Sequence, residues 1–272
     1  MSIFQIDNLY AKELDVFHEH SESFLLQYYE PEPGVFIAES PMIIQRALNA
    51  GYEPVSMLVE DRSMQFVEIV LEQCGIGQDA EIPIYVAPLE ELKKITGFHL
   101  TRGVLCAMRR KRLLSVEGVL HDARRVVILD SVMNPTNVGA IFRSAAALGM
   151  DAVLLTKGST DPLYRRAARV SMGAVFQIPW TFMDQWPEDV AMLKQYGFMV
   201  AAMSLMDDSV SLRDVKISHD DKIALVMGTE GPGLPPETVR ACDLSVRIPM
   251  AHGVDSLNVA AASAVAFWSI NS

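Results

Sequence analysis

The feature that most constrains the fold is a short apolar run that ends abruptly in a polar loop. Val126 to Leu129 are four consecutive β-branched or aliphatic residues, a pattern typical of a strand buried on both faces of a parallel sheet. The loop leads into Asn134-Pro135, which predicts a helix start, because Asn accepts from free backbone amides and Pro has no amide to leave unpaired. Ligands of such sheets bind beyond the carboxyl ends of the strands. This strand, loop and helix therefore predict a ligand-binding site at the carboxyl edge of the sheet.

The predicted helix directs one cationic side chain toward that edge. Gly139 and Arg143 are four residues apart and share a helical face. Because helical side chains lean toward the N-terminus, Arg143 should extend over the bare Gly139 toward Asn134–Asn137. Taken alone, the loop is equally consistent with a simple capping role for Asn137 and a solvated arginine. The interpretation therefore depends on the rest of the chain.

Composition restricts the class of protein. The 272 residues, 50% hydrophobic and 21% charged, are enough for one large or two ordinary globular domains. The sequence contains no run of about 18 apolar residues that could cross a membrane. Its first residues lack the pattern of a secretory signal, so we expect a cytoplasmic protein. The three cysteines and six histidines show no disulfide or metal-ligand spacing, so we expect no metal.

Charge is distributed unevenly along the chain. The net charge is −11, yet twelve Lys/Arg stand against five Asp/Glu between Arg102 and Arg169. A basic segment in an otherwise acidic chain is typical of a protein that binds a nucleic acid at one surface. Such charged runs are also common on surfaces that contact only solvent. The cations that we expect to contact the nucleic acid are Arg109, Arg110, Lys111, Arg112, Arg165, Arg166 and Arg169.

Apolar runs alternate with helical patterns, which predicts an α/β fold class. The stretch Ser115–Asp122 is interpreted as the linker between two units. We therefore expect an N-terminal α/β domain over residues 1–115 and a second domain over residues 116–272. The expected strands are Val35–Ala38, Val55–Val59, Ile84–Ala87, Gly103–Met108, Val126–Leu129, Ala152–Leu155, Val175–Ile178, Phe198–Met203, Ile223–Met227 and Val246–Ile248.

Two further strand ends carry distinctive loops. The strand Ile223–Met227 runs into Gly228-Thr-Glu230-Gly231-Pro-Gly233, a rigid loop with few side chains whose backbone can approach a ligand closely. The strand before Pro249 breaks into a second polar loop, and Asp255 or Ser256 is expected to cap an alanine-rich helix. Taken alone, the glycine-rich loop indicates a tight turn rather than a binding site, and the second loop indicates only the start of a well-packed C-terminal helix.

Three motifs occur together in order: N-x-G-x-x-x-R at Asn137, Gly139 and Arg143; G-x-E-G-x-G from Gly228 to Gly233; and I-P-M followed by S-L-N-V-A at Ile248–Met250 and Ser256–Ala260. This combination resembles the SpoU/TrmH branch of the SPOUT RNA methyltransferases over about residues 120–272. The resemblance implies an α/β domain with a deep C-terminal trefoil knot, a homodimer, and S-adenosylmethionine as cofactor. It also implies that the first 115 residues are an RNA-binding domain similar to small ribosomal proteins that bind kinked RNA.

The activity that the resemblance implies is methyl transfer to a ribose 2′-hydroxyl of structured RNA, with rRNA favoured over tRNA. By the same resemblance, the catalytic residues are Arg143, Asn137 and Glu230. Because a guanidinium is a poor general base, we expect Arg143 to orient the hydroxyl and a neighbouring phosphate through paired hydrogen bonds. The expected cofactor-binding residues are Met203, Met227, Gly228, Gly231, Ile248, Pro249, Met250, Ser256, Leu257, Asn258 and Ala260.

Three alternatives remain at this point. The first is a noncatalytic RNA-binding protein that keeps the fold, and the second is a methyltransferase that acts on a base nitrogen. The third is a nucleotide-binding enzyme such as a dehydrogenase. Gly75-Ile-Gly77-Gln-Asp-Ala80 matches the dinucleotide fingerprint, but it follows a predicted helix and precedes a predicted strand, the reverse of the required order.

Overall fold

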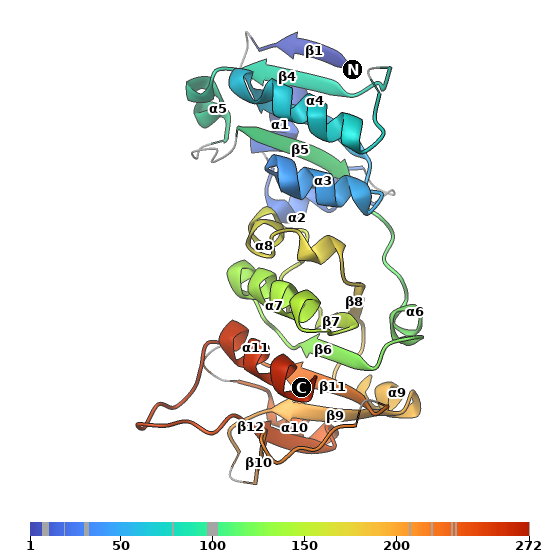
Figure 1. Cartoon of the computed structure of the whole chain (residues 1–272), viewed down its shortest axis with the longest axis vertical. Helices are drawn as coiled ribbons and strands as arrows, with labels where there is room; N and C mark the ends of the chain where they lie inside the picture. Colours follow the sequence, from blue (N-terminus) through green and yellow to red (C-terminus); the bar gives the residue numbers. More distant parts are fainter. Residues whose placement is uncertain are drawn as a thin grey trace. The chain divides into compact units, whose positions relative to one another are not determined.

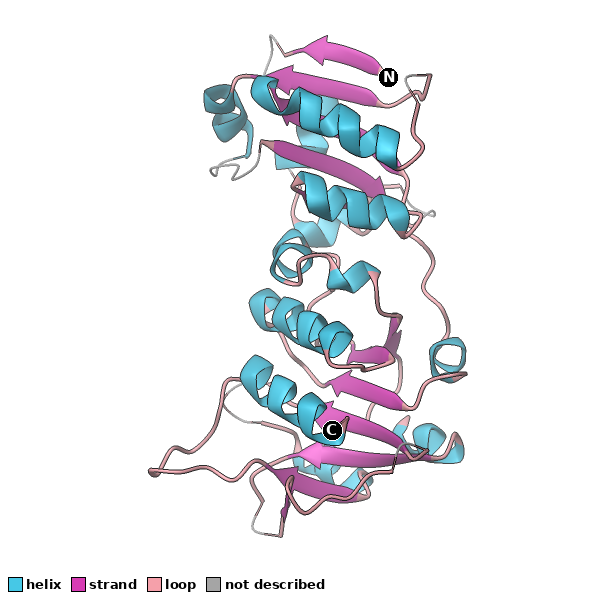
Figure 2. Cartoon of the chain, viewed as in Figure 1, coloured by secondary structure: helices cyan, strands magenta, loops and turns pink. Residues whose placement is uncertain are grey.

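The computed structural model describes residues 1–6, 11–18, 20–29, 33–77, 79–96, 103–206, 208–218, 220–229, 231 and 233–271. These residues form two compact units (Figures 1 and 2). The first unit comprises Met1–Arg112 and Leu163–Phe176, and the second comprises Leu113–Pro162 and Gln177–Ser272. The segment 163–176, which the sequence analysis includes in the second domain, thus belongs to the first unit.

The first unit is built on a five-stranded sheet with the order β1-β4-β3-β5-β2. Its strands are β1 (Ser2–Gln5), β2 (Val35–Glu39), β3 (Pro54–Glu60), β4 (Pro83–Ala87) and β5 (Val104–Arg109). β5 is antiparallel to both of its neighbours, whereas β1, β4 and β3 are parallel. Its α-helices are α1 (Asp15–His18), α2 (Glu22–Leu25), α3 (Pro41–Asn49), α4 (Met64–Gln73), α5 (Leu89–Thr96) and α8 (Arg165–Val170).

Helices cover both faces of this sheet, which explains why both faces of the edge strand β2 are buried. Figure 1 shows α3 and α4 in front of the sheet and α1 behind it. Because successive side chains of a strand point to opposite faces, Val35 and Ile37 pack with Leu14 and Phe17 on one face. The other residues of β2 are directed to the opposite face, and all five residues of the strand are buried.

The segment 163–176 is fixed to the edge strand β2 by a buried carboxylate. Glu39 ends β2 and is 3% exposed. Its carboxylate accepts a hydrogen bond of 3.0 Å from Nη1 of Arg169 and lies 3.9 Å from Nε of Arg165. Arg46 of α3 donates to the carbonyl of Met172. Charge-assisted hydrogen bonds therefore hold α8 against the first unit.

The strand predicted at Val175–Ile178 is wrong. Ala174–Phe176 forms a 3₁₀ turn, and the next strand, β8, begins at Trp180. The ring of Phe176 packs against Phe36 and Tyr52, with centroids 5.7 and 5.4 Å away. These tertiary contacts override the local preference of Val175 for a strand.

Substitution of Glu39 tests this attachment. Glu39→Gln should lower the free energy of unfolding by about 1–3 kcal/mol, because a neutral amide replaces the carboxylate that accepts from Arg169 and faces Arg165. The matched control is Glu90→Gln, which removes an exposed pair with Lys93 and should cost at most about 0.5 kcal/mol. Urea unfolding with limited proteolysis of residues 163–176 measures both. Equal stability of the two variants would contradict the role of Glu39.

The second unit contains a seven-stranded sheet with the order β10-β12-β9-β11-β6-β7-β8. Every pairing in it is parallel, which confirms the predicted α/β class. Its strands are β6 (Arg125–Leu129), β7 (Ala152–Thr156), β8 (Trp180–Met183), β9 (Phe198–Met203), β10 (Val210–Ser211), β11 (Lys222–Met227) and β12 (Leu244–Arg247).

Two groups of helices bury the faces of this sheet. The helices are α6 (Val116–Leu120), α7 (Pro135–Ala147), α9 (Val190–Gln195), α10 (Pro236–Ala241) and α11 (Val259–Ile270). Val126 and Ile128 pack with side chains of α6 and α9. α7 and α11 lie side by side (Figure 1) and pack against each other. Within the described ranges, each helix is too short or too polar to cross a bilayer.

Candidate functional site

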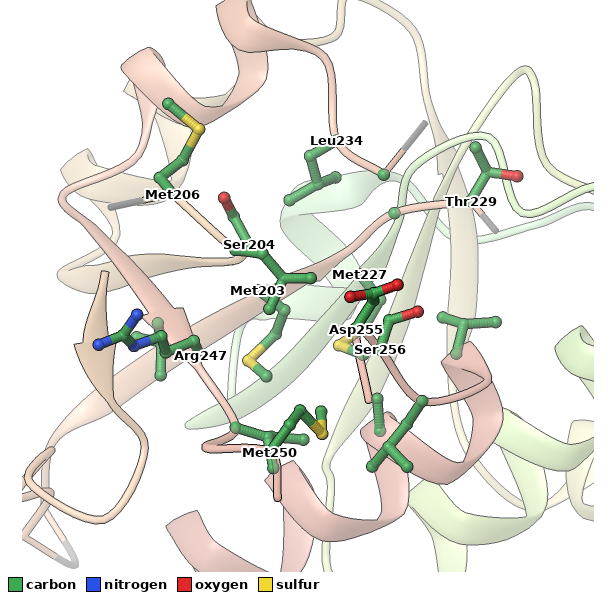
Figure 3. A pocket seen from close by; sticks show the side chains of 18 of the residues that line it. Met203, Ser204, Met206, Met227, Thr229, Leu234, Arg247, Met250, Asp255 and Ser256 are labelled. Carbon is green, nitrogen blue, oxygen red and sulfur yellow. The ribbon is translucent and has the colours of Figure 1, made fainter. Parts of the chain in front are cut away.

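A cavity of about 430 Å³ lies where three strands of the second unit end (Figure 3). Met203 ends β9, Met227 ends β11 and Arg247 ends β12, and all three line the cavity. Carboxyl ends of parallel strands are the usual position of ligand sites in α/β folds. The loop 248–257 and the first turns of α11 complete the described wall.

The glycine-rich loop after β11 folds back on itself to form one side of the cavity. Thr229 and Gly233 form an isolated antiparallel bridge. A Cβ on Gly228 would lie 2.8 Å from the backbone of Gly233 and Leu234, closer than real contacts allow. Gly231 has φ +87°, a conformation that side chains disfavour. The loop therefore needs glycine at these positions, and its backbone faces the cavity.

Asn258 connects the two other motifs. It is the N-cap of α11, where its side-chain oxygen accepts from the Ala260 amide at 2.9 Å. Its Nδ2 donates to Oδ1 of Asn137 at 3.2 Å, and Asn137 is 6% exposed. The predicted cap at Asp255 or Ser256 is wrong, because the helix begins only at Val259. One side chain thus caps α11 and joins it to α7.

A buried carboxylate that the sequence analysis did not single out lies beside these loops. Asp130 follows β6 and is 4% exposed. Its Oδ2 accepts from Nε1 of Trp186 and from Oγ1 of Thr238, both at 3.0 Å, and its Oδ1 accepts from Ser131 at 3.1 Å. Asp130 therefore fixes the segment before α9 and the helix α10. The sequence signal that could have indicated this residue is an acidic side chain directly after the apolar run Val126–Leu129.

Eight of the eleven predicted cofactor-binding residues line the cavity: Met203, Met227, Gly228, Gly231, Ile248, Met250, Ser256 and Leu257. Pro249, Asn258 and Ala260 do not line it. Asn258 and Ala260 instead form the cap at the start of α11. The residues that line the cavity without being predicted are Ser204, Leu205, Met206, Thr229, Gly233, Leu234, Val246, Arg247, Asp255, Val259 and Ala262. Five of these eleven residues are next to a predicted residue in the sequence. The sequence thus indicated the strand ends that form the cavity better than it indicated the individual side chains.

Of the predicted catalytic residues, the two that the structure describes, Arg143 and Asn137, do not line the cavity of their own chain. Arg143 is exposed on α7 and does not line the cavity. Asn137 is buried against Asn258. Glu230 lies outside the described residues. Asn134 caps α7 as predicted, accepting from the Thr136 amide at 2.9 Å.

The seven cations predicted to bind nucleic acid all belong to the first unit. Several already have protein partners: Arg165 and Arg169 face Glu39, and the Arg109 guanidinium lies 5.2 Å from the ring centroid of Tyr29. Lys111 donates to the carbonyl of Ala50 at 2.5 Å. Arg112 and Arg166 are exposed, and Nε of Arg110 donates to the carbonyl of Val35 at 3.3 Å.

The cavity wall suits a small organic ligand with a flat or sulfur-containing part. Its side chains include Met203, Met206, Met227 and Met250, which are polarisable and adapt to irregular shapes.

Burial raises the pKa of the Cys242 thiol, near the end of α10, to about 11, so this thiol is not an activated nucleophile. Over the part of the chain that the structure describes, no three His, Cys, Asp or Glu side chains form a metal-binding group.

Fold and cavity define the class: an α/β protein whose parallel sheet carries a small-molecule site at its carboxyl edge. Residues 124–268 match the model of the SpoU rRNA Methylase family. The chain therefore belongs to the SpoU rRNA methylase family, which confirms the resemblance to SpoU/TrmH proteins.

Individual relatives agree with this assignment. The chain is 42% identical over 234 residues to an uncharacterised tRNA/rRNA methyltransferase of Mycobacterium bovis, covering 85% of this chain and 79% of the relative. It is 29% identical to a 23S rRNA (guanosine-2′-O-)-methyltransferase of Acinetobacter baylyi, covering 77% and 84%. An AdoMet-bound rRNA methyltransferase structure from Sinorhizobium meliloti has the same fold, with TM-score 0.81 and 24% identity over 98% of this chain and 97% of that chain.

Substitutions of Asn258 separate its two roles. Asn258→Asp keeps an oxygen for the cap but removes the donor to Asn137, and should lower the free energy of unfolding by about 1 kcal/mol. Asn258→Ala also loses the cap, which should cost about 1–2 kcal/mol in addition.

The matched control is Asn134→Asp, because the Asn134 oxygen accepts from Thr136 and a carboxylate serves the cap of α7 equally well. Urea unfolding of all three variants gives the comparison. If Asn258→Asp proved as stable as Asn134→Asp, the bond to Asn137 would contribute nothing.

Proposed function

We propose that this protein transfers a methyl group from S-adenosylmethionine to a ribose 2′-hydroxyl of structured RNA, with rRNA favoured over tRNA. The observation that carries the proposal is the cavity at the ends of β9, β11 and β12, closed by the glycine-rich loop. The relative named as a 23S rRNA 2′-O-methyltransferase and the AdoMet-bound neighbour support the same chemistry.

The residues present fit such a cofactor. The cavity volume of about 430 Å³ lies within the range of about 300–1,000 Å³ typical of small-molecule sites. Met203, Met227 and Met250 offer soft apolar contacts to an adenine ring. Gly228 brings backbone to the wall where a side chain would clash with Leu234. When bound, the cofactor supplies an electrophilic methyl group on a sulfonium.

The chain's own residues are proposed to position the acceptor. Arg143 holds the ribose hydroxyl and an adjacent phosphate with its planar donors, and Asn137 and Glu230 shape the same site. Positioning of this kind can contribute about 7–11 kcal/mol to lowering the barrier. Arg109–Arg112, Arg165, Arg166 and Arg169 would bind RNA through the first unit.

A homodimer belongs to this proposal, because Arg143 does not reach the cavity of its own chain. The outer side of α11 exposes Trp268 by 67% and Val265 by 45%, and Met133 before α7 is 68% exposed. Exposed apolar surface on neighbouring elements is typical of an interface. A second copy on this face would bring Arg143 of the partner subunit toward the cofactor loops. The deep trefoil knot of the SPOUT fold belongs to the same proposal.

Labelled cofactor tests the activity directly. Total RNA incubated with the protein and methyl-labelled S-adenosylmethionine should yield dinucleotides that resist alkali, since a 2′-O-methyl group blocks cleavage of the next phosphodiester. Mapping of these dinucleotides identifies the RNA. Label in alkali-sensitive nucleotides would instead indicate base methylation, and cofactor binding without any labelled RNA would indicate a noncatalytic protein.

Arg143 variants test the positioning role. Arg143→Ala should lower kcat/KM by about 100-fold with an unchanged Kd for the cofactor, because orientation is lost while the cavity is intact. Arg143→Lys should also lose most activity, since a lysine cannot make the paired contacts. The control is Arg213→Ala, an exposed cation of the same unit outside the cavity. Full activity of Arg143→Lys would refute the bidentate role.

Mixed subunits test whether two chains share each site. Arg143→Ala and Gly228→Ala are both expected to be inactive, the second because its Cβ would overlap Gly233. After unfolding and refolding together in equal amounts, about a quarter of wild-type activity should return if each site draws Arg143 from one subunit and its loop from the other. Mixtures as inactive as the separate variants would place Arg143 and the loop of a single chain in one site.

A further inference from the structure

Asp255 is the one acidic side chain among the described residues that line the cavity. Figure 3 shows its carboxylate among the side chains that line the cavity. The sequence suggested that this carboxylate caps α11, but Asn258 performs that role. Within the described ranges, Asp255 has no hydrogen bond or ion pair through its carboxylate. Helix capping therefore does not explain why an acidic residue stands at position 255.

The rest of the described wall provides no opposing charge for this carboxylate. The single cation is Arg247, and Figure 3 shows its guanidinium extending away from Met203 and Met227. The remaining lining is aliphatic, sulfur-containing, hydroxyl-bearing or glycine. Asp255 is exposed in the free chain. A ligand that covers it when it fills the cavity displaces its water, and this exchange is favourable where the ligand brings a positive charge. The wall is therefore complementary to a cationic ligand.

We propose that Asp255 binds a cationic group of the cofactor, either its sulfonium or its α-ammonium. This inference rests on the proposed function, because S-adenosylmethionine carries both groups. The product, S-adenosylhomocysteine, keeps the ammonium but has an uncharged thioether sulfur. A carboxylate opposite the sulfonium would hold the cofactor more tightly than the product and so favour product release, whereas one opposite the ammonium would hold both alike.

Calorimetric titration with three related ligands tests the assignment. S-adenosylmethionine has both cations, S-adenosylhomocysteine has only the ammonium, and 5′-methylthioadenosine has neither but fills the adenosine part of the cavity. Asp255→Asn should raise the Kd for S-adenosylmethionine about tenfold, as expected for a charge-assisted contact, and leave that for 5′-methylthioadenosine within about twofold. Asp255→Glu should retain much of the affinity because it keeps the charge.

The product identifies which cation is bound. If Asp255→Asn binds S-adenosylhomocysteine as wild type does, the carboxylate faces the sulfonium, and if that affinity also falls tenfold, it faces the ammonium. Either result supports the proposal. The control is Asp122→Asn, a carboxylate of the same unit with a 95% exposed side chain beside His121, which should leave all three affinities unchanged.

Two results would overturn the proposal. Unchanged affinity of Asp255→Asn for all three ligands would show that the carboxylate makes no contact, while wild-type binding would leave the proposed function standing. An equal loss for all three ligands would show that Asp255 only shapes the loop. Wild-type protein that binds none of the three would refute the proposed function and this inference together.

Discussion

The candidate site depends on the parallel pairing of β11 with β6 on one side and β9 on the other. The register places Met227 opposite Leu129 and Val226 opposite Ala202, so these strands end at nearly the same level. The Asp130 amide continues the pairing by donating to the carbonyl of Met227 at 2.9 Å. Because β6 and β11 are buried on both faces, a shift by one residue would not expose an apolar face. The hydrogen bonds between the strands, and that of Asp130 at their ends, therefore fix the register. The loops that follow the strands are thereby directed to one edge.

In each unit a buried carboxylate, Glu39 in the first and Asp130 in the second, attaches a segment outside the sheet to a strand end. The two carboxylates work differently. Glu39 is paired with cations, so it holds α8 through charge as well as hydrogen bonds. Asp130 accepts mainly from neutral donors, Trp186 and Thr238 among them. A buried charge without a cation is tolerated only when its lone pairs are filled. The hydrogen bonds to Asp130 therefore hold α10 in place next to the glycine-rich loop.

The sequence predicts the strands and their ends well because the evidence is local. An apolar run followed by Asp130 or Gly228 marks a buried strand and its exit regardless of the rest of the chain. The start of α11 was less predictable, since Asp255, Ser256 and Asn258 are all good caps and only the bond from Asn258 to Asn137 distinguishes them. The strand expected at Val175 failed because the neighbours of Phe176 lie more than a hundred residues earlier in the chain. The attachment of α8 to Glu39 was not predicted for the same reason, because Arg165 and Arg169 lie more than a hundred residues after Glu39 in the chain.

The exposed position of Arg143 is explained if the cofactor binds in the cavity while the ribose of the RNA is positioned at a separate, open surface. The described cavity wall is mostly apolar and is built from strand ends and backbone, which suits a small cofactor but offers a phosphate little. RNA is too large to enter such a cavity, so the group that orients its ribose has to stand on an open surface. α7 meets this need, because Ile141 and Phe142 bury the helix against the sheet while Arg143 remains exposed. In the proposed dimer, that exposed side chain would meet the open side of a cavity that a second chain has already formed.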